Sequence, residues 1–221
     1  MDWSPLWISF KVAAVSTFFT FFVGIAAAKA VTSMKRGKFI ADGILSLPLV
    51  LPPTVLGFFL LLMFGKNSTI GHALDCAGIN VIFTWQGAAI AAAVASFPIM
   101  YRTVRGAFEQ VDTELIDAAR QLGCDRVRAF FLIWIPLSWP GIASGVTMAF
   151  ARALGEFGAT IMIAGNLPGK TRTMSVAVYT AMQSGDRNLA FRWTAVILSI
   201  SLISLVAINF LTGIRYRERA I

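Results

Sequence analysis

The sequence predicts an all-α integral membrane protein with about five transmembrane helices. Of its 221 residues, 57% are hydrophobic and only 14% are charged, and the mean hydropathy of +0.73 is too high for an ordinary soluble domain. About 20 apolar residues at 1.5 Å each span a bilayer. Uncharged runs suited to this task lie at residues 12–28, 43–65, 76–101, 129–151 and 193–214.

These runs predict helices over about residues 6–30, 40–64, 84–104, 130–154 and 193–214. The first run is the shortest, but Lys11 and Lys29 can extend it because their methylene stems lie along lipid while the ammonium groups reach the two interfaces. No hydrophilic domain of useful size interrupts the pattern. Residues 1–221 are therefore expected to form a single membrane domain.

The second helix contains three prolines, Pro48, Pro52 and Pro53. Each proline removes a backbone donor and clashes with the preceding turn, so this helix must kink or unwind. Backbone carbonyls freed within a membrane need protein or water as partners, which indicates the wall of a pathway. A purely structural kink is the alternative interpretation.

Small residues at four-residue spacing mark the third and fourth helices and predict close helix packing there. They are Ala88, Ala92 and Ser96, then Gly141, Gly145 and Ala149. The apolar pieces 157–169 and 175–182 that follow are too short to cross, so we expect them to be re-entrant or packed on the outer face.

The net charge of +8 could suggest a nucleic-acid partner or could reflect the membrane topology. The distribution of the basic residues along the chain decides between these two interpretations. Cytoplasmic loops of membrane proteins are rich in Lys and Arg, and the basic residues here cluster in alternate loops. This predicts an outer N-terminus, an inner C-terminus and a cytoplasmic loop at about 105–129, with no nucleic-acid partner. The clusters are Lys35, Arg36 and Lys38; Arg102, Arg105, Arg120, Arg126 and Arg128; and Arg215, Arg217 and Arg219. Trp3, Trp7, Trp85 and Trp193 fall near expected outer helix ends.

Four short features have ordinary explanations. Residues 28–30 resemble a signal-peptide cleavage site, but the first residues lack a basic region, so we expect the segment to remain in the chain. Residues 164–171 match a relaxed P-loop, but we expect them on the outer face, where ATP is absent. Cys76 and Cys124 are expected on opposite sides of the membrane, and His72 has no partners at metal-ligand spacing. We therefore predict no catalytic, cofactor or metal site in this chain.

The polar loop between the third and fourth helices is the most informative segment. Its acids precede its bases, an order that suits the dipole of a short helix. Ala118, Ala119 and Leu122 can form a narrow face, and Gly123 is a natural helix stop. Such a helix would fit a groove on a soluble partner. An ordinary solvated loop is the alternative.

This loop resembles the EAA loop of ABC-type import permeases. The matching positions are Asp117, Ala118, Ala119, Gly123, Ile133 and Pro136. Asp117 replaces the usual Glu and Ile135 the usual Leu, and both changes keep the chemical character. The stretches LPLVLPPTVLGFFLL (47–61) and RALGEFGATIMIAGNLPGKTRTMSVAVYT (152–180) are similar to molybdate ABC transporter permeases, and sulfate permeases share part of the second stretch.

The resemblance implies an ABC importer permease fold and a location in the bacterial cytoplasmic (inner) membrane. It also implies a permease homodimer, two cytoplasmic ATPase subunits on the inner loops and an extracytoplasmic molybdate-binding protein. The chain itself would be a pathway and not an enzyme. The alternatives are a sulfate or thiosulfate permease, a stand-alone carrier or channel, and a membrane enzyme or scaffold. A carrier normally needs ionisable residues within its spans, and these are nearly absent here.

Arg152 and Glu156 lie one helical turn apart near the outer end of the fourth helix. Charges this close to a membrane span are usually functional. We expect them to shape an outer gate, with Gly158 giving backbone freedom and Pro48, Pro52 and Pro53 lining the pathway. A simple interfacial ion pair is the alternative.

Overall fold

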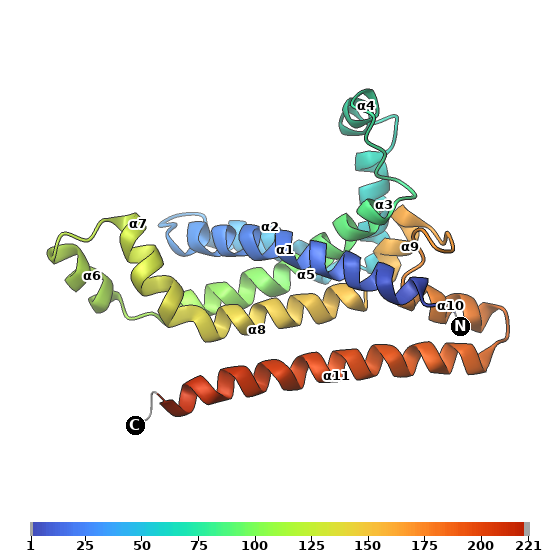
Figure 1. The fold of residues 1–221 in the computed structure, drawn as a ribbon. Helices are drawn as coiled ribbons and strands as arrows, with labels where there is room; N and C mark the ends of the chain where they lie inside the picture. The colour runs from blue at the N-terminus through green and yellow to red at the C-terminus, as the bar shows by residue number, and fades with distance from the viewer. Residues whose placement is uncertain (1, 219–221) are drawn as a thin grey trace.

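The computed structural model describes residues 2–218, with the side chains of all of these except Thr113 and residues 207–218. Arg219 and the side chains of Arg215 and Arg217 therefore lie outside the described residues. The chain folds into helices in the order shown in Figure 1. Their bounds are α1 Ser4–Thr32, α2 Lys38–Val50, α3 Pro53–Phe64, α4 Thr69–Cys76, α5 Trp85–Glu109, α6 Thr113–Gln121, α7 Arg126–Ala129, η1 Phe130–Trp134, α8 Ile135–Leu154, α9 Gly158–Ala164, α10 Met174–Gln183 and α11 Arg187–Glu218.

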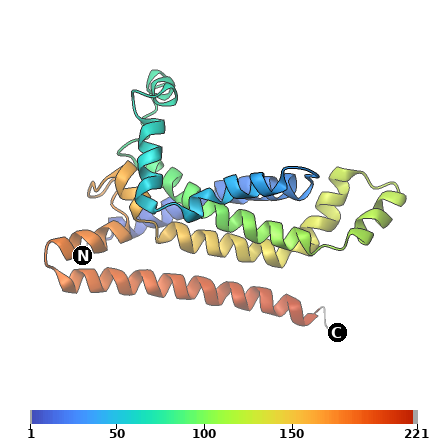
Figure 2. The ribbon, with the colours of Figure 1, turned by 180° about the vertical axis from the view of Figure 1, so that it is seen from behind.

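Within the part of the chain that the structure describes, four helical stretches are long and apolar enough to cross a membrane: α1, α5, Arg126–Leu154 and Arg187–Val206. The bent pair α2 and α3 makes a fifth if it is counted as one span. The predicted all-helical fold with about five spans is thus confirmed. The long helices lie side by side, with α6, α7 and the C-terminal end of α11 at one end and the N-terminus, α9 and α10 at the other (Figures 1 and 2). This arrangement matches the expected placement of the termini relative to the polar loop.

The second span contains the kink or unwound segment that its prolines predicted within residues 40–64. It is broken into α2 and α3, whose axes differ by 107°. Leu51 and Pro52 take extended conformations, with ψ angles of 138° and 136°. Each of them precedes a proline, and a residue before proline is pushed out of the helical region. Pro52 and Pro53 together therefore force the break, while Pro48 remains inside α2.

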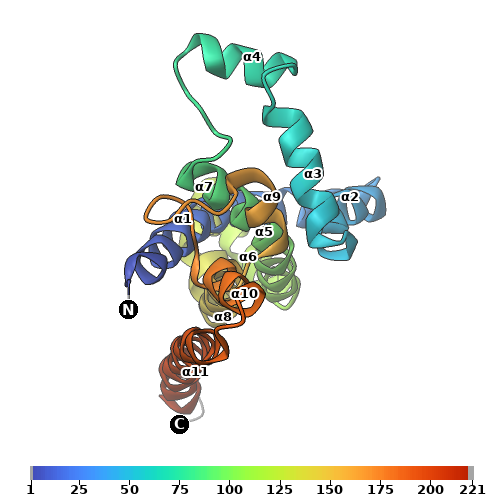
Figure 3. The same ribbon diagram turned by 90° about the vertical axis from the view of Figure 1, so that its right-hand side faces the viewer.

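The core lies where α1, α5 and α8 pack together. Ala88, Ala92 and Ser96 of α5 are completely buried, as their spacing predicted. A Cβ added to Gly141 of α8 would lie 2.4 Å from the Ala107 Cβ, so only glycine allows α8 to approach α5 this closely. The end-on view in Figure 3 shows α11 at one margin of the molecule and α3 and α4 on the opposite side.

The segment between α8 and α11 does not cross the bundle. Its helices α9 and α10 are short, and α9 packs against α3 and α5 while α10 packs against α11 and α1. The Ser9 hydroxyl of α1 accepts a hydrogen bond of 2.8 Å from the Met174 amide at the start of α10. The P-loop-like stretch joins α9 to α10, and its Lys170 is exposed. It therefore joins two helices, whereas a P-loop follows a strand.

Candidate functional site

The helix α6 contains the residues that resemble the EAA loop, and it projects from one end of the bundle (Figure 1). It begins at Asp112, whose carboxylate accepts a hydrogen bond of 2.9 Å from the Glu114 amide. Asp117 and Ala118 are exposed, and Ala119 is half-buried. The Asp117 carboxylate lies 3.3 Å from Nη1 of Arg120, an exposed pair that contributes at most about 1 kcal/mol to stability. The face of α6 that carries Asp117 is therefore available to a partner.

The end of α6 is a Schellman motif around Gly123. The Cys124 amide donates to the Ala119 carbonyl at 2.9 Å, and the Gly123 amide donates to the Arg120 carbonyl at 3.0 Å. Gly123 has φ of +83°, a conformation that glycine adopts without strain. Beside it, the Leu122 side chain is 90% exposed. An apolar side chain this exposed next to a fixed helix end is typical of a docking element.

Ile133 and Pro136 lie where the segment joins the fourth span. Residues 130–134 form a π-turn, in which the Ile135 amide donates to the Phe130 carbonyl five residues back. Pro136 has no N–H to continue the helix ladder and its ring crowds the preceding turn, so the backbone widens just before it. Ile133 is half-buried and Pro136 is exposed. The segment thus continues into α8 without a flexible linker.

Aromatic contacts hold this junction against α1 and α5. Nζ of Lys29 lies 3.3 Å from the centre of a Trp134 ring and 5.5 Å from that of Phe130. Buried Phe108 of α5 packs edge-on against Trp134, with ring centres 5.3 Å apart. A cation over an indole face contributes roughly 0.5–2 kcal/mol. The sequence predicted Lys29 only at the membrane interface. The aromatic residues after the loop were the signal of a stacking partner.

A second unanticipated cluster joins α2 to α5 at the same end. The Tyr101 hydroxyl donates to Asp42 at 3.0 Å, and Arg105 forms ion pairs with both Asp42 and Glu109. Nζ of Lys38 lies 2.7 Å from the same Glu109 oxygen. Four charges arranged in alternating sign fix the start of α2 on the end of α5. No local pattern reveals this, because Asp42 and Tyr101 are 59 residues apart.

Pro53 and Gly158, two of the predicted gate residues, are in contact. A Cβ added at Gly158 would lie 2.7 Å from the Pro53 Cβ, and one added at Gly57 would lie 2.9 Å from the Ala159 Cα. Two glycines thus let α9 and α3 pack backbone to backbone. Pro52 is exposed at the start of α3, and Pro48 is half-buried about one turn before the bend.

Arg152 and Glu156 form the predicted ion pair, with Nη1 and Oε2 2.5 Å apart. The Glu156 side chain is 1% exposed and that of Arg152 is 32% exposed. Oε1 of Glu156 accepts a hydrogen bond of 2.9 Å from the Ala159 amide, so the carboxylate also holds the first turn of α9. Oε2 has no hydrogen bond to any described residue, so its contact is the ion pair with the Arg152 guanidinium. The geometry therefore links the end of α8 to α9, which itself packs on α3.

Among the described residues, no group of three His, Cys, Asp or Glu side chains could hold a metal ion. Free Cys76 and Cys124 lie on α4 and directly after α6, in separate parts of the fold. The features of the site are therefore exposed helix faces, close helix contacts and ion pairs.

Residues 20–217 match the family of binding-protein-dependent transport system inner membrane components. The chain belongs to this family, and it is therefore a multi-pass inner-membrane protein. Among its relatives, the molybdenum transport system permease protein ModB of Escherichia coli (strain K12) is 45% identical over 222 residues, which cover 99% of this chain and 96% of that protein. The sulfate transport system permease protein CysT of Escherichia coli (strain K12) is 34% identical over 235 residues, covering 100% of this chain and 84% of that protein.

A solved structure of the inward-facing MetNI methionine ABC transporter has a similar fold. Its TM-score is 0.75 at 18% sequence identity, with 96% of each chain covered. The predicted ABC importer permease fold is thereby confirmed, as is the resemblance to the permease family.

Proposed function

We propose that this chain is the membrane-spanning permease subunit of an ATP-driven ABC importer for molybdate, with tungstate as a second cargo. The observation that carries the proposal is the 45% identity to a molybdenum transport permease over 99% of the chain. The exposed α6, capped at both ends and joined to the next span through the short turn at Gly123, gives such a subunit a means of receiving force from an ATPase.

In this proposal α6 is the coupling element. Asp117, Ala118 and Ala119 form the face that enters a groove on the ATPase. Gly123 ends the helix, and Ile133 and Pro136 connect it to α8. The exposed Leu122 supplies apolar contact area beside the charged face. Closure of the ATPase would move α6 as a rigid unit together with the span that follows it.

The gate in this proposal is the contact between the end of α8, α9 and the start of α3. Arg152 and Glu156 hold α9, and Gly158 holds it against Pro53. Pro48 and Pro52 belong to the second span, whose two halves, α2 and α3, run in different directions because of the bend between them. Separation of α3 from α9 would open the outer side of the pathway.

The partners follow from the same proposal. Two cytoplasmic ATPase subunits would bind α6 of two permease copies, and an extracytoplasmic molybdate-binding protein would dock at the opposite end. The α2–α3 arm is strongly apolar on its outer side, with Phe39 94% exposed and Val50 81% exposed. Lipid and a second copy of the chain are suitable cover for such a surface. Hydrolysis of ATP would take place on the ATPase, and this chain would carry no catalytic site of its own.

The test is vanadate-sensitive, ATP-driven uptake of radiolabelled molybdate into proteoliposomes. These contain the chain, its ATPase and its binding protein, with tungstate and sulfate as competitors. Competition by tungstate but not by sulfate supports the proposal. An assembled complex that takes up no oxyanion with ATP would refute it.

A sulfate permease is the second candidate, and the 34% identity to a sulfate transport permease across the whole chain favours it over other cargoes. Uptake of labelled sulfate that excess molybdate does not inhibit would replace the first candidate with this one.

A further inference from the structure

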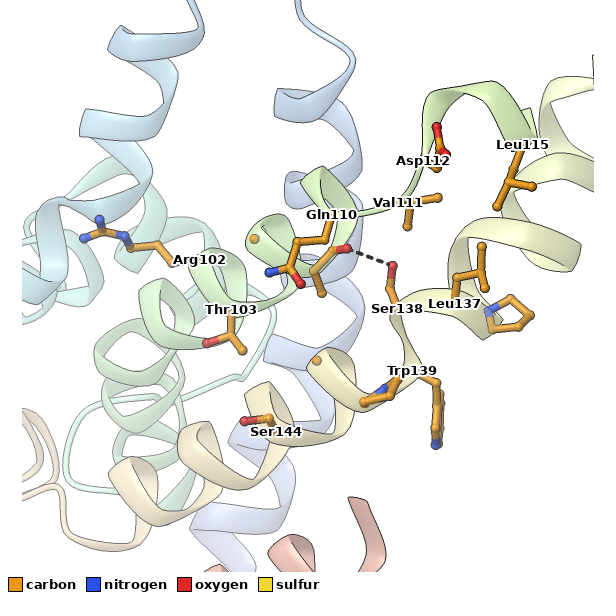
Figure 4. A pocket seen from close by; sticks show the side chains of 15 residues that line it. Arg102, Thr103, Gln110, Val111, Asp112, Leu115, Leu137, Ser138, Trp139 and Ser144 are labelled. Carbon is orange, nitrogen blue, oxygen red and sulfur yellow. Dashed lines mark hydrogen bonds between the residues drawn. The ribbon is translucent and has the colours of Figure 1, made fainter. Parts of the chain in front are cut away.

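A groove of about 790 Å³ lies between the inner half of α5 and the start of α8 (Figure 4). On α5 its lining includes Arg102, Thr103, Gly106 and Gln110, which share one helix face because they are three or four residues apart. Ser144 of α8 lies on the opposite wall. Neither the sequence motifs nor the gate described above include these residues.

The groove is open because its floor lacks side chains. Gly141 packs directly on Ala107, which brings the two helices together. A Cβ added at Gly106 would meet no atom within 4 Å, so this position faces open space in the groove. A side chain at position 106 would therefore begin in open space and extend into the groove.

The lining combines apolar side chains, such as Leu137 and Trp139, with polar ones that are unsuited to lipid. It presents the hydroxyls of Thr103 and Ser144, the amide of Gln110 and a guanidinium on helices that are apolar enough to cross a membrane. Polar and charged groups at such positions face water-filled cavities or protein. The groove is therefore expected to hold water in at least one state of the transporter.

The charge of the groove favours an anion at one end. Its lining contains two charged residues, Arg102 and Asp112, which lie at opposite ends in Figure 4. Arg102 makes no ion pair with any residue that the structure describes, whereas the neighbouring Arg105 is paired twice. Arg102, Thr103 and Ser144 line the same groove, and a guanidinium and two hydroxyls are donors that a tetrahedral oxyanion accepts.

We propose that this groove is the inner section of the translocation pathway and that Arg102, Thr103 and Ser144 form a transient site for a divalent oxyanion within it. The inference rests on the proposed function. One guanidinium in an open, hydrated groove binds weakly, which suits a site that must release its cargo to the cytoplasm. Arg102 would draw the anion inward, and the hydroxyls would replace part of its hydration shell.

The first test is the reactivity of Ser144→Cys after Cys76 and Cys124 have been replaced by serine. Anionic sulfonatoethyl and cationic trimethylammonioethyl methanethiosulfonate are added to the cytoplasmic side of inside-out vesicles that contain the assembled complex. A positive charge in the groove attracts the anionic reagent and repels the cationic one, so Arg102→Gln should lower the anionic-to-cationic rate ratio severalfold.

Arg36→Gln is the matched control, because Arg36 is exposed in the loop between α1 and α2 and is not part of the groove lining. It should leave the rate ratio unchanged. Absence of labelling at position 144 in every nucleotide state, or a ratio that Arg102→Gln does not change, would overturn the proposal.

The second test is Gly106→Leu, which fills the groove while replacing a poor helix former. We expect loss of uptake with an assembled complex that still binds ATP. Uptake by the unmodified chain tests the proposed function separately. Normal uptake by Gly106→Leu would overturn only the proposal that the groove is part of the pathway. If position 144 is labelled with the expected charge preference but the unmodified chain takes up no oxyanion, only the proposed cargo is overturned.

Discussion

Replacing Gly158 by alanine would test how closely α9 packs against the start of α3. The added Cβ would lie 2.7 Å from the Pro53 Cβ and 3.3 Å from both the Pro53 carbonyl carbon and the Thr54 nitrogen. Non-bonded carbon atoms prefer separations of about 3.5–4.0 Å. One helix must therefore move by about 1 Å, and the nearest atoms belong to a proline ring and backbone that cannot rotate away.

The size of the effect follows from two opposing terms. Overpacking a close contact costs roughly 1–3 kcal/mol. Alanine is a better helix former than glycine by up to about 1 kcal/mol in a helix interior, and by less at the first position of α9. The φ angle of Gly158 is not positive, so backbone strain adds nothing. We expect a net destabilisation of about 1–2 kcal/mol.

The assay is thermal unfolding of the purified complex in nanodiscs, together with uptake per ATP hydrolysed. Gly43→Ala in α2 is the matched control, because a Cβ there meets no atom within 4 Å. The midpoint should fall for Gly158→Ala and stay equal or rise for Gly43→Ala, and uptake per ATP should change only in the former. Equal midpoints and equal uptake for both variants would refute the packing argument.

Three further outcomes are expected. Asp117→Lys should abolish ATP-coupled uptake yet shift the free energy of unfolding by at most about 1 kcal/mol, because Asp117 is exposed. The control is Asp75→Lys, the same charge reversal on α4, where Asp75 is also exposed. It should leave uptake intact in the same proteoliposomes. Arg152→Ala should lower both the thermal midpoint and uptake, because it leaves the buried Glu156 carboxylate unpaired. The double variant Arg152→Ala with Glu156→Gln should lower them less, because it removes that charge as well. Unchanged transport and ATPase coupling in Arg152→Ala would refute the gate. Lys29→Met should destabilise the complex by roughly 0.5–2 kcal/mol through loss of the contact with the aromatic rings, and an unchanged midpoint would contradict that role.

The sequence predicted features that depend on local chemistry. Pro52 and Pro53 predicted a break in the second span, because the restriction that a proline places on the preceding residue needs no tertiary context. Gly123 predicted the end of α6 for the same kind of reason. The four-residue spacing around Gly141 predicted close packing, although not which helix would be the neighbour.

Features that join distant parts of the chain were not predicted. The angle of 107° between α2 and α3 depends on α9, which packs against α3 through Gly57 and Gly158. The position of Lys29 over Trp134 depends on the π-turn, and the pairing of Asp42 with Arg105 depends on how α2 returns along α5. Sequence spacing defines one helix face at a time, so contacts between faces become visible only in the fold.

The proposed coupling element and the proposed gate lie at the two ends of one helical rod. The stretch Arg126–Leu154 begins just after α6, and near its other end Arg152 pairs with the carboxylate that holds α9. The rod is packed most tightly against α5 at Gly141, which makes this contact the natural pivot. Arg152 lies about 17 Å beyond it at 1.5 Å per residue, so a tilt of about 10° would move the gate end about 3 Å. Coupling would then need no chain of separate switches, because a rigid span with two packed positions is sufficient.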